Sequence, residues 1–243
     1  DFLVESIGDS INESLKGSFG AVDGQAEWVR TSGRSGTPPA PIYSVYDGGY
    51  VFGRAGWQPQ PGMPDSFYSL RSSSTRPGTA HTHDDGTGLT FYSKGVSWIG
   101  DPGPFRYENS DPLRAYLKTR AAHSALTVGK TSRSKWSGVQ RLSAQSDWAT
   151  GGNDTTCLQD NTWKTVVLVR CTQYVRSVDA LIVTDYVNAA GGGKKAKGRF
   201  TWQRWQIPSG VDTGYEGSTL VLSKGDKKLD VVKSGTDAWV VDH

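Results

Sequence analysis

The feature that most constrains this chain is a succession of short strand-like segments from residue 43 onward, separated by turn residues. Asp47-Gly48-Gly49 and Lys94-Gly95 each lie between two such segments, which is typical of β-hairpins. No helical crossover of the kind that parallel strands require lies between the segments. The sequence therefore predicts an all-β fold, a large antiparallel two-sheet β-sandwich or a barrel-like double sheet.

A helical turn is expected at residues 112–118, followed by a strand that carries His123. Further strands are expected at residues 163–170, 180–188, 198–207, 218–223, 228–233 and 238–241. Turn residues separate them at residues 151–154, 191–193, 208–210 and 225–226. The 30 glycines and nine tryptophans of the chain agree with a fold of strands and turns.

The first 16 residues differ from the rest of the chain in the spacing of their apolar residues. Their apolar side chains recur at near-helical spacing, at Phe2, Leu3, Ile7, Ile11 and Leu15. A stretch rich in Gly, Ser and Pro follows at residues 32–42 and is typical of a domain boundary. We therefore expect a helical N-terminal and linker segment over residues 1–36 and a β-sandwich domain over residues 37–243.

Charge and hydropathy exclude two classes of partner. The net charge is +3 and the basic residues are scattered, so nucleic acid is not expected as a ligand. No apolar run approaches the roughly 20 residues of a membrane span. The two cysteines, Cys157 and Cys171, flank a turn and a strand, which favours a disulfide across a hairpin and a secreted or periplasmic protein. The alternative is two separate buried thiols.

Three of the four histidines lie within 43 residues, beside carboxylates. His81-Thr82-His83 is followed by Asp84 and Asp85, and in an extended strand His81, His83 and Asp85 would share one face. Imidazole and carboxylate together are a ligand set for zinc or iron. The alternative is two solvated histidines beside a turn.

Four segments in this order resemble the C-terminal β-domain of heparinase II/III-type polysaccharide lyases: HTHDDGTGLTFYSKG, DPG, FRYENSD and AAHSALTV. The resemblance covers roughly residues 42–208. It implies a supersandwich-like β-domain that carries a structural zinc ion. It also implies that the histidine segment is irregular, because the two histidines of the family's motif have different roles.

Residue by residue, the resemblance implies His83, Asp101 and His123 as the zinc ligands. It implies His81 as a cleft histidine near the substrate carboxylate. Tyr107 corresponds to the tyrosine that some members use as proton donor, and Tyr116 competes for that role.

Members of this family cleave uronic-acid polysaccharides by β-elimination, so an acidic polysaccharide, a uronan or glycosaminoglycan, is the expected partner. Arg71, Arg76 and Arg106 flank the motif and are candidates to bind acidic sugar groups. Surface solubility explains these arginines equally well. The family's enzymes also have a large α/α-toroid before the β-domain, which these residues do not supply. We therefore expect an incomplete lyase that needs such a domain or chain.

Two other classes of function remain as alternatives. His83, Asp84, Asp85 and His123 would suit the facial triad of a cupin-like, metal-dependent oxygenase. The tryptophans would suit a non-catalytic carbohydrate-binding module. Metal identity separates the first alternative from a lyase, because zinc favours the lyase and iron or manganese the oxygenase.

Overall fold

The structure is a computed structural model that describes residues 24–31, 33–38, 41–46, 49–57, 65–72, 74, 81–103, 105–108, 110–128, 142–150, 152–163, 166–190 and 201–235. The expected helix at residues 1–16 and the expected strand at residues 238–241 lie outside these ranges. Every strand pair is antiparallel, which confirms the all-β prediction. A short helix, α2 (Gly24–Arg30), lies in the N-terminal part. None of the described helices is long and apolar enough to cross a membrane.

The first five strands form one sheet in chain order. They are β1 (Tyr43–Tyr46), β2 (Tyr50–Arg54), β3 (Phe67–Arg71), β4 (Leu89–Ser93) and β5 (Val96–Ile99). Lys94 and Gly95 join β4 to β5 with φ angles of 55° and 75°. Two consecutive residues in the left-handed region match the twist of a tight hairpin. The antiparallel pairing predicted for the segments that flank residues 47–49 and the hairpin predicted at residues 94–95 are confirmed.

A second sheet has the order β10-β9-β8-β7. Its strands are β7 (Leu142–Thr150), β8 (Asn153–Asp160), β9 (Val166–Val175) and β10 (Ala180–Ala189). Burial alternates along the whole of β9, so Leu168 and Tyr174 face inward while Cys171 faces outward. The sequence analysis missed β7 and β8 and assigned residues 151–154 to a turn. Strand β8 starts inside that stretch, and its inward side chains include the buried polar residues Asp154 and Thr156, so it lacks an apolar alternation.

The two sheets pack on a shared core. Tyr68, Leu70 and Phe91 of the first sheet belong to the same buried apolar cluster as Leu158 and Tyr174 of the second. Polar contacts also cross between the sheets. The Tyr43 hydroxyl lies 2.7 Å from Thr156 Oγ1, and the Tyr68 hydroxyl donates to Asp154 Oδ2 at 3.3 Å.

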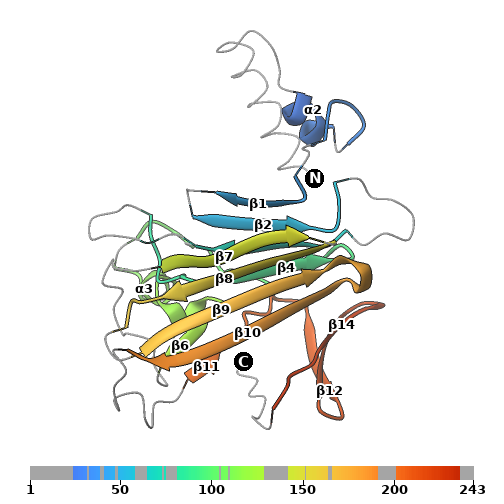
Figure 1. Cartoon of the computed structure of the whole chain (residues 1–243). Coiled ribbons are helices and arrows are strands. Elements are labelled where there is room, and N and C mark those ends of the chain that lie inside the picture. The colour runs from blue at the N-terminus through green and yellow to red at the C-terminus, as the bar shows by residue number, and fades with distance from the viewer. Residues whose placement is uncertain are drawn as a thin grey trace.

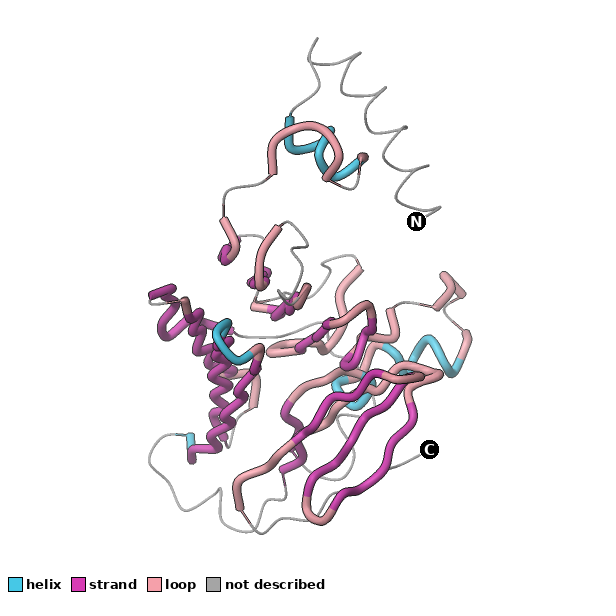
Figure 2. Tube along the Cα trace, turned by 90° about the vertical axis from the view of Figure 1, so that its right-hand side faces the viewer, coloured by secondary structure: helices cyan, strands magenta, loops and turns pink. Residues whose placement is uncertain are grey.

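The remaining strands form two small sheets instead of extending the large ones. Strand β6 (Leu126–Val128) pairs with β11 (Thr201–Gln203). Strands β12 (Asp212–Glu216), β13 (Thr219–Lys224) and β14 (Lys227–Val231) form a meander on the opposite side of the molecule from α2 (Figures 1 and 2). Leu220 and Leu222 of β13 join the core of the sandwich. The described strands are thus divided among four sheets, of which the two largest form the predicted sandwich.

One disulfide links the outward faces of β8 and β9. Cys157 and Cys171 lie directly opposite each other in the register of the two strands, with Cα atoms 4.0 Å apart. Both side chains are half-buried. The two cysteines are therefore bonded to each other, as predicted, and are not separate buried thiols.

The segment before β6 contains the predicted helical turn, α3 (Pro112–Leu117). Asp111 caps it and accepts hydrogen bonds from the backbone N–H groups of Leu113 and Arg114. A 3₁₀ turn, η1 (Arg120–Ala122), follows, and His123 comes directly after it. The prediction of a strand carrying His123 is wrong, because the His123 N–H donates to the Arg120 carbonyl within this turn instead of to a neighbouring strand.

Candidate functional site

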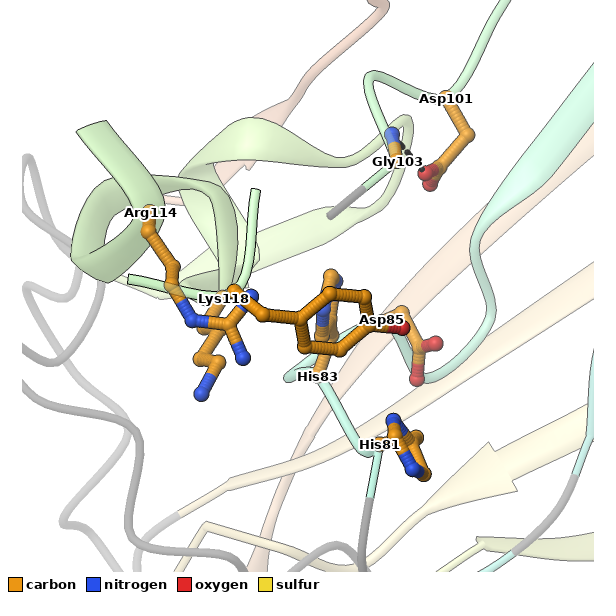
Figure 3. A pocket seen from close by; sticks show the side chains of 8 residues that line it. His81, His83, Asp85, Asp101, Gly103, Arg114 and Lys118 are labelled. Atoms are coloured by element: carbon orange, nitrogen blue, oxygen red, sulfur yellow. Dashed lines mark hydrogen bonds between the residues drawn. The ribbon is translucent and has the colours of Figure 1, made fainter. Parts of the chain in front are cut away.

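A pocket of about 250 Å³ lies between the histidine segment and helix α3 (Figure 3). It is lined by residues from three parts of the chain: His81, His83, Asp85, Asp101, Gly103, Tyr107, Arg114 and Lys118. Both signs of charge and two imidazoles meet there. The lining therefore combines proton-transfer groups with groups that bind anions.

The histidine segment is irregular, as the family resemblance implied. His81 has a φ of 56° and Thr87 a φ of 62°, both in the left-handed region that non-glycine residues rarely adopt. The simple extended-strand expectation for His81, His83 and Asp85 is therefore wrong. In the observed conformation the His81 ring meets the Tyr107 ring edge-on, with centroids 5.7 Å apart.

A fully buried arginine, Arg120, fixes this segment. Its guanidinium donates to Asp84 Oδ1 at 3.0 Å, to the Gly86 carbonyl at 2.7 Å and to Asp160 Oδ2 at 2.5 Å. Burial disfavours its charge, but the Asp160 and Asp84 carboxylates outweigh that effect and raise the pKa of Arg120. The histidine segment, η1 and the end of β8 are thereby tied together.

A second buried arginine, Arg170 of β9, also forms hydrogen bonds to this region. It makes two hydrogen bonds to Asp185, at 2.8 and 2.7 Å. Its remaining nitrogen donates to the carbonyls of Thr87 and Ser124, at 3.0 and 2.8 Å. The backbone at Thr87, which ends the histidine segment, and at Ser124, which follows His123, is thus bonded to the four-stranded sheet.

The three residues expected to bind zinc lie together at one side of the pocket. His123 Nδ1 is 2.6 Å from Asp101 Oδ2, and the rings of His83 and His123 are 5.4 Å apart between centroids. Burial and the charge of His123 lower the pKa of His83. Burial opposes ionisation of Asp101, but its hydrogen bond to His123 prevails and lowers the pKa of that carboxyl.

The side chains of His83, Asp101 and His123 can be compared with the ligands that a metal ion requires. In the described part of the chain, no group of three or more His, Cys, Asp or Glu side chains is arranged to hold one. His123 is nevertheless fully buried, and its Nε2 has no hydrogen-bond partner there. Two imidazoles and a carboxylate are donors that zinc accepts. The chemistry of His83, Asp101 and His123 therefore fits zinc, although Asp101 here contacts the His123 ring directly.

The two candidate proton donors occupy different places. Tyr107 lines the pocket, is 71% exposed and has the Arg114 guanidinium 4.9 Å from its ring centroid. Tyr116 is not among the lining residues, and its hydroxyl contacts the Ala121 carbonyl at 3.5 Å. Geometry thus brings Tyr107, and not Tyr116, together with His81.

The flanking arginines selected from the sequence do not line this pocket. Arg71 lies 3.5 Å from Asp85 and donates to the Gly49 carbonyl at 2.8 Å. Arg106 forms an ion pair with Asp111. Arg76 lies outside the described residues.

Two cations that do line the pocket, Arg114 and Lys118, were missed in the sequence analysis. Both belong to the expected helical turn and are four residues apart. That spacing places side chains on one face of a helix, and it was the available signal.

Comparison with known proteins gives the same fold. Heparan sulfate lyase HepC from Pedobacter heparinus aligns with a TM-score of 0.72 and 16% identity, covering 91% of this chain and 33% of that one. A crystal structure of heparinase III aligns with a TM-score of 0.68 and 15% identity, covering 90% and 35%. A heparinase III that is the BT4657 gene product gives 0.67 and 15%, with 89% and 32% covered. The chain thus spans about a third of the length of these proteins.

At such identities the structural likeness concerns the fold alone. No curated protein sequence matches the chain. A family match comes from the sequence itself, over residues 37–243. Because that match covers most of the chain, this protein belongs to the family described as Heparinase II/III-like, C-terminal.

Proposed function

We propose that this chain is the β-domain of a polysaccharide lyase that cleaves a uronic-acid polysaccharide by β-elimination. The observation that carries the proposal is the meeting of His81 and Tyr107 at one pocket, with their rings edge-to-face at 5.7 Å. An imidazole titrates near neutral pH, and a phenol can donate or accept a proton. Family membership supports lyase chemistry for this pair.

In β-elimination a base removes the proton from C5 of the uronate. The electron pair forms the C4–C5 double bond as the bond from C4 to the glycosidic oxygen breaks, and that oxygen takes up a proton. We assign neutralisation of the uronate carboxylate to His81 and protonation of the departing oxygen to Tyr107. Neutralisation matters because the C5 proton is weakly acidic and the transition state gathers negative charge on the carboxylate.

We further propose that His83, Asp101 and His123 hold a structural zinc ion. When bound, the ion would fix the relative positions of three chain segments beside the pocket. The closeness of the three side chains supports this, since His123 Nδ1 lies 2.6 Å from Asp101 Oδ2 and the ring centroids of His83 and His123 are 5.4 Å apart. The buried Nε2 of His123, which has no partner among the described residues, is also consistent with it.

The lyase is proposed to need an α/α-toroid domain, because this chain spans only about a third of the similar lyases. On this proposal residues 1–36 form a helical and linker segment and residues 37–243 the β-domain. Arg71, Arg76 and Arg106 then remain candidates to bind acidic groups along the cleft that the toroid completes. The disulfide supports a secreted or periplasmic location.

The test measures unsaturated uronate ends by their absorbance, using a chain that carries both the toroid and this domain. His81→Ala is expected to abolish turnover, and Tyr107→Phe to lower it by roughly 10²–10⁴-fold, the usual contribution of a general acid. Tyr116→Phe is the matched control and should leave turnover unchanged. Full activity in His81→Ala would refute the proposal.

Two further measurements separate the proposal from its alternatives. The 243-residue chain alone should show little cleavage, since positioning of the sugar supplies roughly 7–11 kcal/mol of a barrier. Elemental analysis should find zinc, and His83→Ala should lower zinc content and stability together. Iron or manganese would favour the oxygenase, whereas polysaccharide binding with neither metal nor cleavage would favour a carbohydrate-binding module.

A further inference from the structure

We propose that strand β10 is an interface for a second copy of this chain, which pairs with it antiparallel about a two-fold axis at Thr184. The pairing would join the four-stranded sheets of two copies into one continuous sheet. This inference is independent of the proposed lyase function and uses no residue of the pocket.

Strand β10 is the outermost strand of its sheet (Figure 1). All of its residues, Ala180–Ala189, pair with β9 in one continuous register without a bulge. Among the described residues, no backbone hydrogen bond joins β10 to any segment other than β9. A regular edge of this length offers a row of unpaired N–H and C=O groups to another strand.

The features that usually protect an edge strand from pairing are missing in β10. Such strands are short, are interrupted by a bulge, or carry Lys or Pro. The edge strands β1 and β5 of the first sheet have four residues each, whereas β10 has ten and contains neither Lys nor Pro. Its one charged residue, Asp185, is bonded to Arg170. Large apolar side chains are exposed instead: Ile182 at 48%, Tyr186 at 52% and Val187 at 38%.

The position of the disulfide identifies which backbone groups of β10 point outward. Cys157 and Cys171 have Cα atoms 4.0 Å apart, the short spacing of an opposed pair that exchanges no backbone hydrogen bonds. The N–H and C=O of Cys171 then point to the other side, toward Thr184, which lies opposite it in β10. Because this direction alternates along a strand, the backbone groups of Val183 and Asp185 point away from β9. They are available to bond to the same residues of a second copy.

The outer side chains of β10 are complementary to themselves in this arrangement. Ile182 and Tyr186 are exposed on the same face of the strand, two residues before and two residues after Thr184. In an antiparallel pair centred on Thr184, each Ile182 therefore lies opposite Tyr186 of the second copy. A β-branched residue opposite an aromatic one is a favourable cross-strand pair. A two-fold pair uses the same surface in both copies and closes after two, so it covers both edges at once.

The experiment measures the mass of the full 243-residue chain by sedimentation equilibrium over a range of protein concentrations. The native chain should show a monomer–dimer equilibrium. Thr184→Lys places two like charges opposite each other at the two-fold axis and should weaken the dimer about tenfold or more. Thr184→Glu should do the same. An equimolar mixture of the two variants should associate again as a heterodimer, which would also show that both variants are folded.

A matched control is available on another edge strand. Ser97→Lys places the same charge on an exposed hydroxyl-bearing residue of β5 and should associate like the native chain. Hydrogen exchange supplies a second measurement. The amides of Val183 and Asp185 should exchange slowly at high protein concentration and rapidly at low concentration, because only the dimer gives them hydrogen-bond partners.

A native chain that stays monomeric at every concentration would overturn the proposal. Equal weakening by Thr184→Lys and Ser97→Lys would overturn it as well, because it would indicate a general effect of charge. A dimer that persists in Thr184→Lys, or a mixture of the Lys and Glu variants that fails to associate, would contradict pairing about Thr184. Each of these outcomes leaves the proposed lyase function intact.

Discussion

The β-sandwich and the walls of the pocket are held together in different ways. The sandwich has regular strands and an apolar core in which Leu70 and Leu158 are fully buried. The pocket walls consist of the irregular histidine segment, the residues Asp101, Gly103 and Tyr107 that follow β5, and the six-residue helix α3 with its last residue Lys118. Their fixed points are two buried arginines, Arg120 and Arg170, bonded to carboxylates and backbone carbonyls.

The difference shows how an irregular surface acquires a defined shape. Apolar burial is not directional, so it stabilises the sandwich without fixing individual loop atoms. Charged hydrogen bonds are directional, and each buried arginine reaches several chain segments at once. Substitutions in the two regions should therefore differ in what they change: stability alone in the sandwich, stability and pocket geometry together in the walls.

The largest effect is expected for Arg120→Met. The change leaves Asp84 and Asp160 without their buried cation, and breaking such a network destabilises by about 3–5 kcal/mol. The free energy of unfolding in urea measures this loss. The NMR signals of His81 and His83 should shift as well, because the segment that carries them is released.

A triple substitution serves as the control, because it removes every charge of the Arg120 network. Arg120→Met combined with Asp84→Asn and Asp160→Asn removes all three charges and should recover part of the lost stability. If the single substitution leaves both stability and the histidine signals unchanged, the arginine does not fix the wall.

The next effect concerns the sandwich alone. Serine in place of both Cys157 and Cys171 opens a link between residues 14 apart, and a loop of this size stabilises by about 3 kcal/mol. Urea unfolding should show the loss, and treatment of the native protein with a reductant should reproduce it. The histidine signals should stay in place, and a shift comparable to that of Arg120→Met would contradict the distinction between the two regions.

A smaller effect is expected for Tyr68→Phe. The hydroxyl of this buried tyrosine donates to Asp154, which also pairs with Arg176, so one hydrogen bond is lost but the carboxylate keeps a partner. A loss of about 1 kcal/mol in the free energy of unfolding follows. A loss above about 3 kcal/mol would show that the hydroxyl stabilises the contact between the two sheets by more than one hydrogen bond.

The smallest effect is confined to one wall and depends on pH. Hydrogen bonding to Arg106 lowers the pKa of Asp111, despite some burial, below its ordinary value of 3.8. The unfolded chain therefore takes up this proton at higher pH than the folded chain. The stabilisation is complete above about pH 3.8 and is lost as the pH falls through the folded pKa.

The amide signals of Leu113 and Arg114 should report this titration, because both groups donate to Asp111. Asp111→Asn is the control and should remove the pH dependence while keeping a cap on α3. An unchanged titration in that variant would assign the effect to another group.

The sequence predicted the first sheet well because its information is local. Burial alternates along β2, β3 and β4, and a tight turn at Lys94-Gly95 joins β4 to β5. Strands β7, β8 and β12 were missed. In β8 the inward positions include Asp154, Thr156 and Asp160, whose partners come from distant segments, so no local pattern reveals that they are buried.

The candidate site was likewise predicted only in part from the sequence. The order of family motifs selected His81, His83, Asp101, Tyr107 and His123, which the structure gathers around one pocket. Arg114 and Lys118 were missed because cations on a short helical turn usually face solvent. Arg120 and Arg170 were missed because a buried arginine depends on carboxylates from other strands, and sequence alone does not pair them.

The disulfide between β8 and β9 also determines which alignment of the two strands can exist. Since alternate residues face opposite sides, a shift of β9 by one position would turn Arg170 outward and bring the outer residues of that strand into the core. Cys157 and Cys171 can bond only when they lie opposite each other, as they do here. Formation of the disulfide thus selects one alignment of β8 and β9. It is the alignment in which Arg170 is buried and bonds to Asp185.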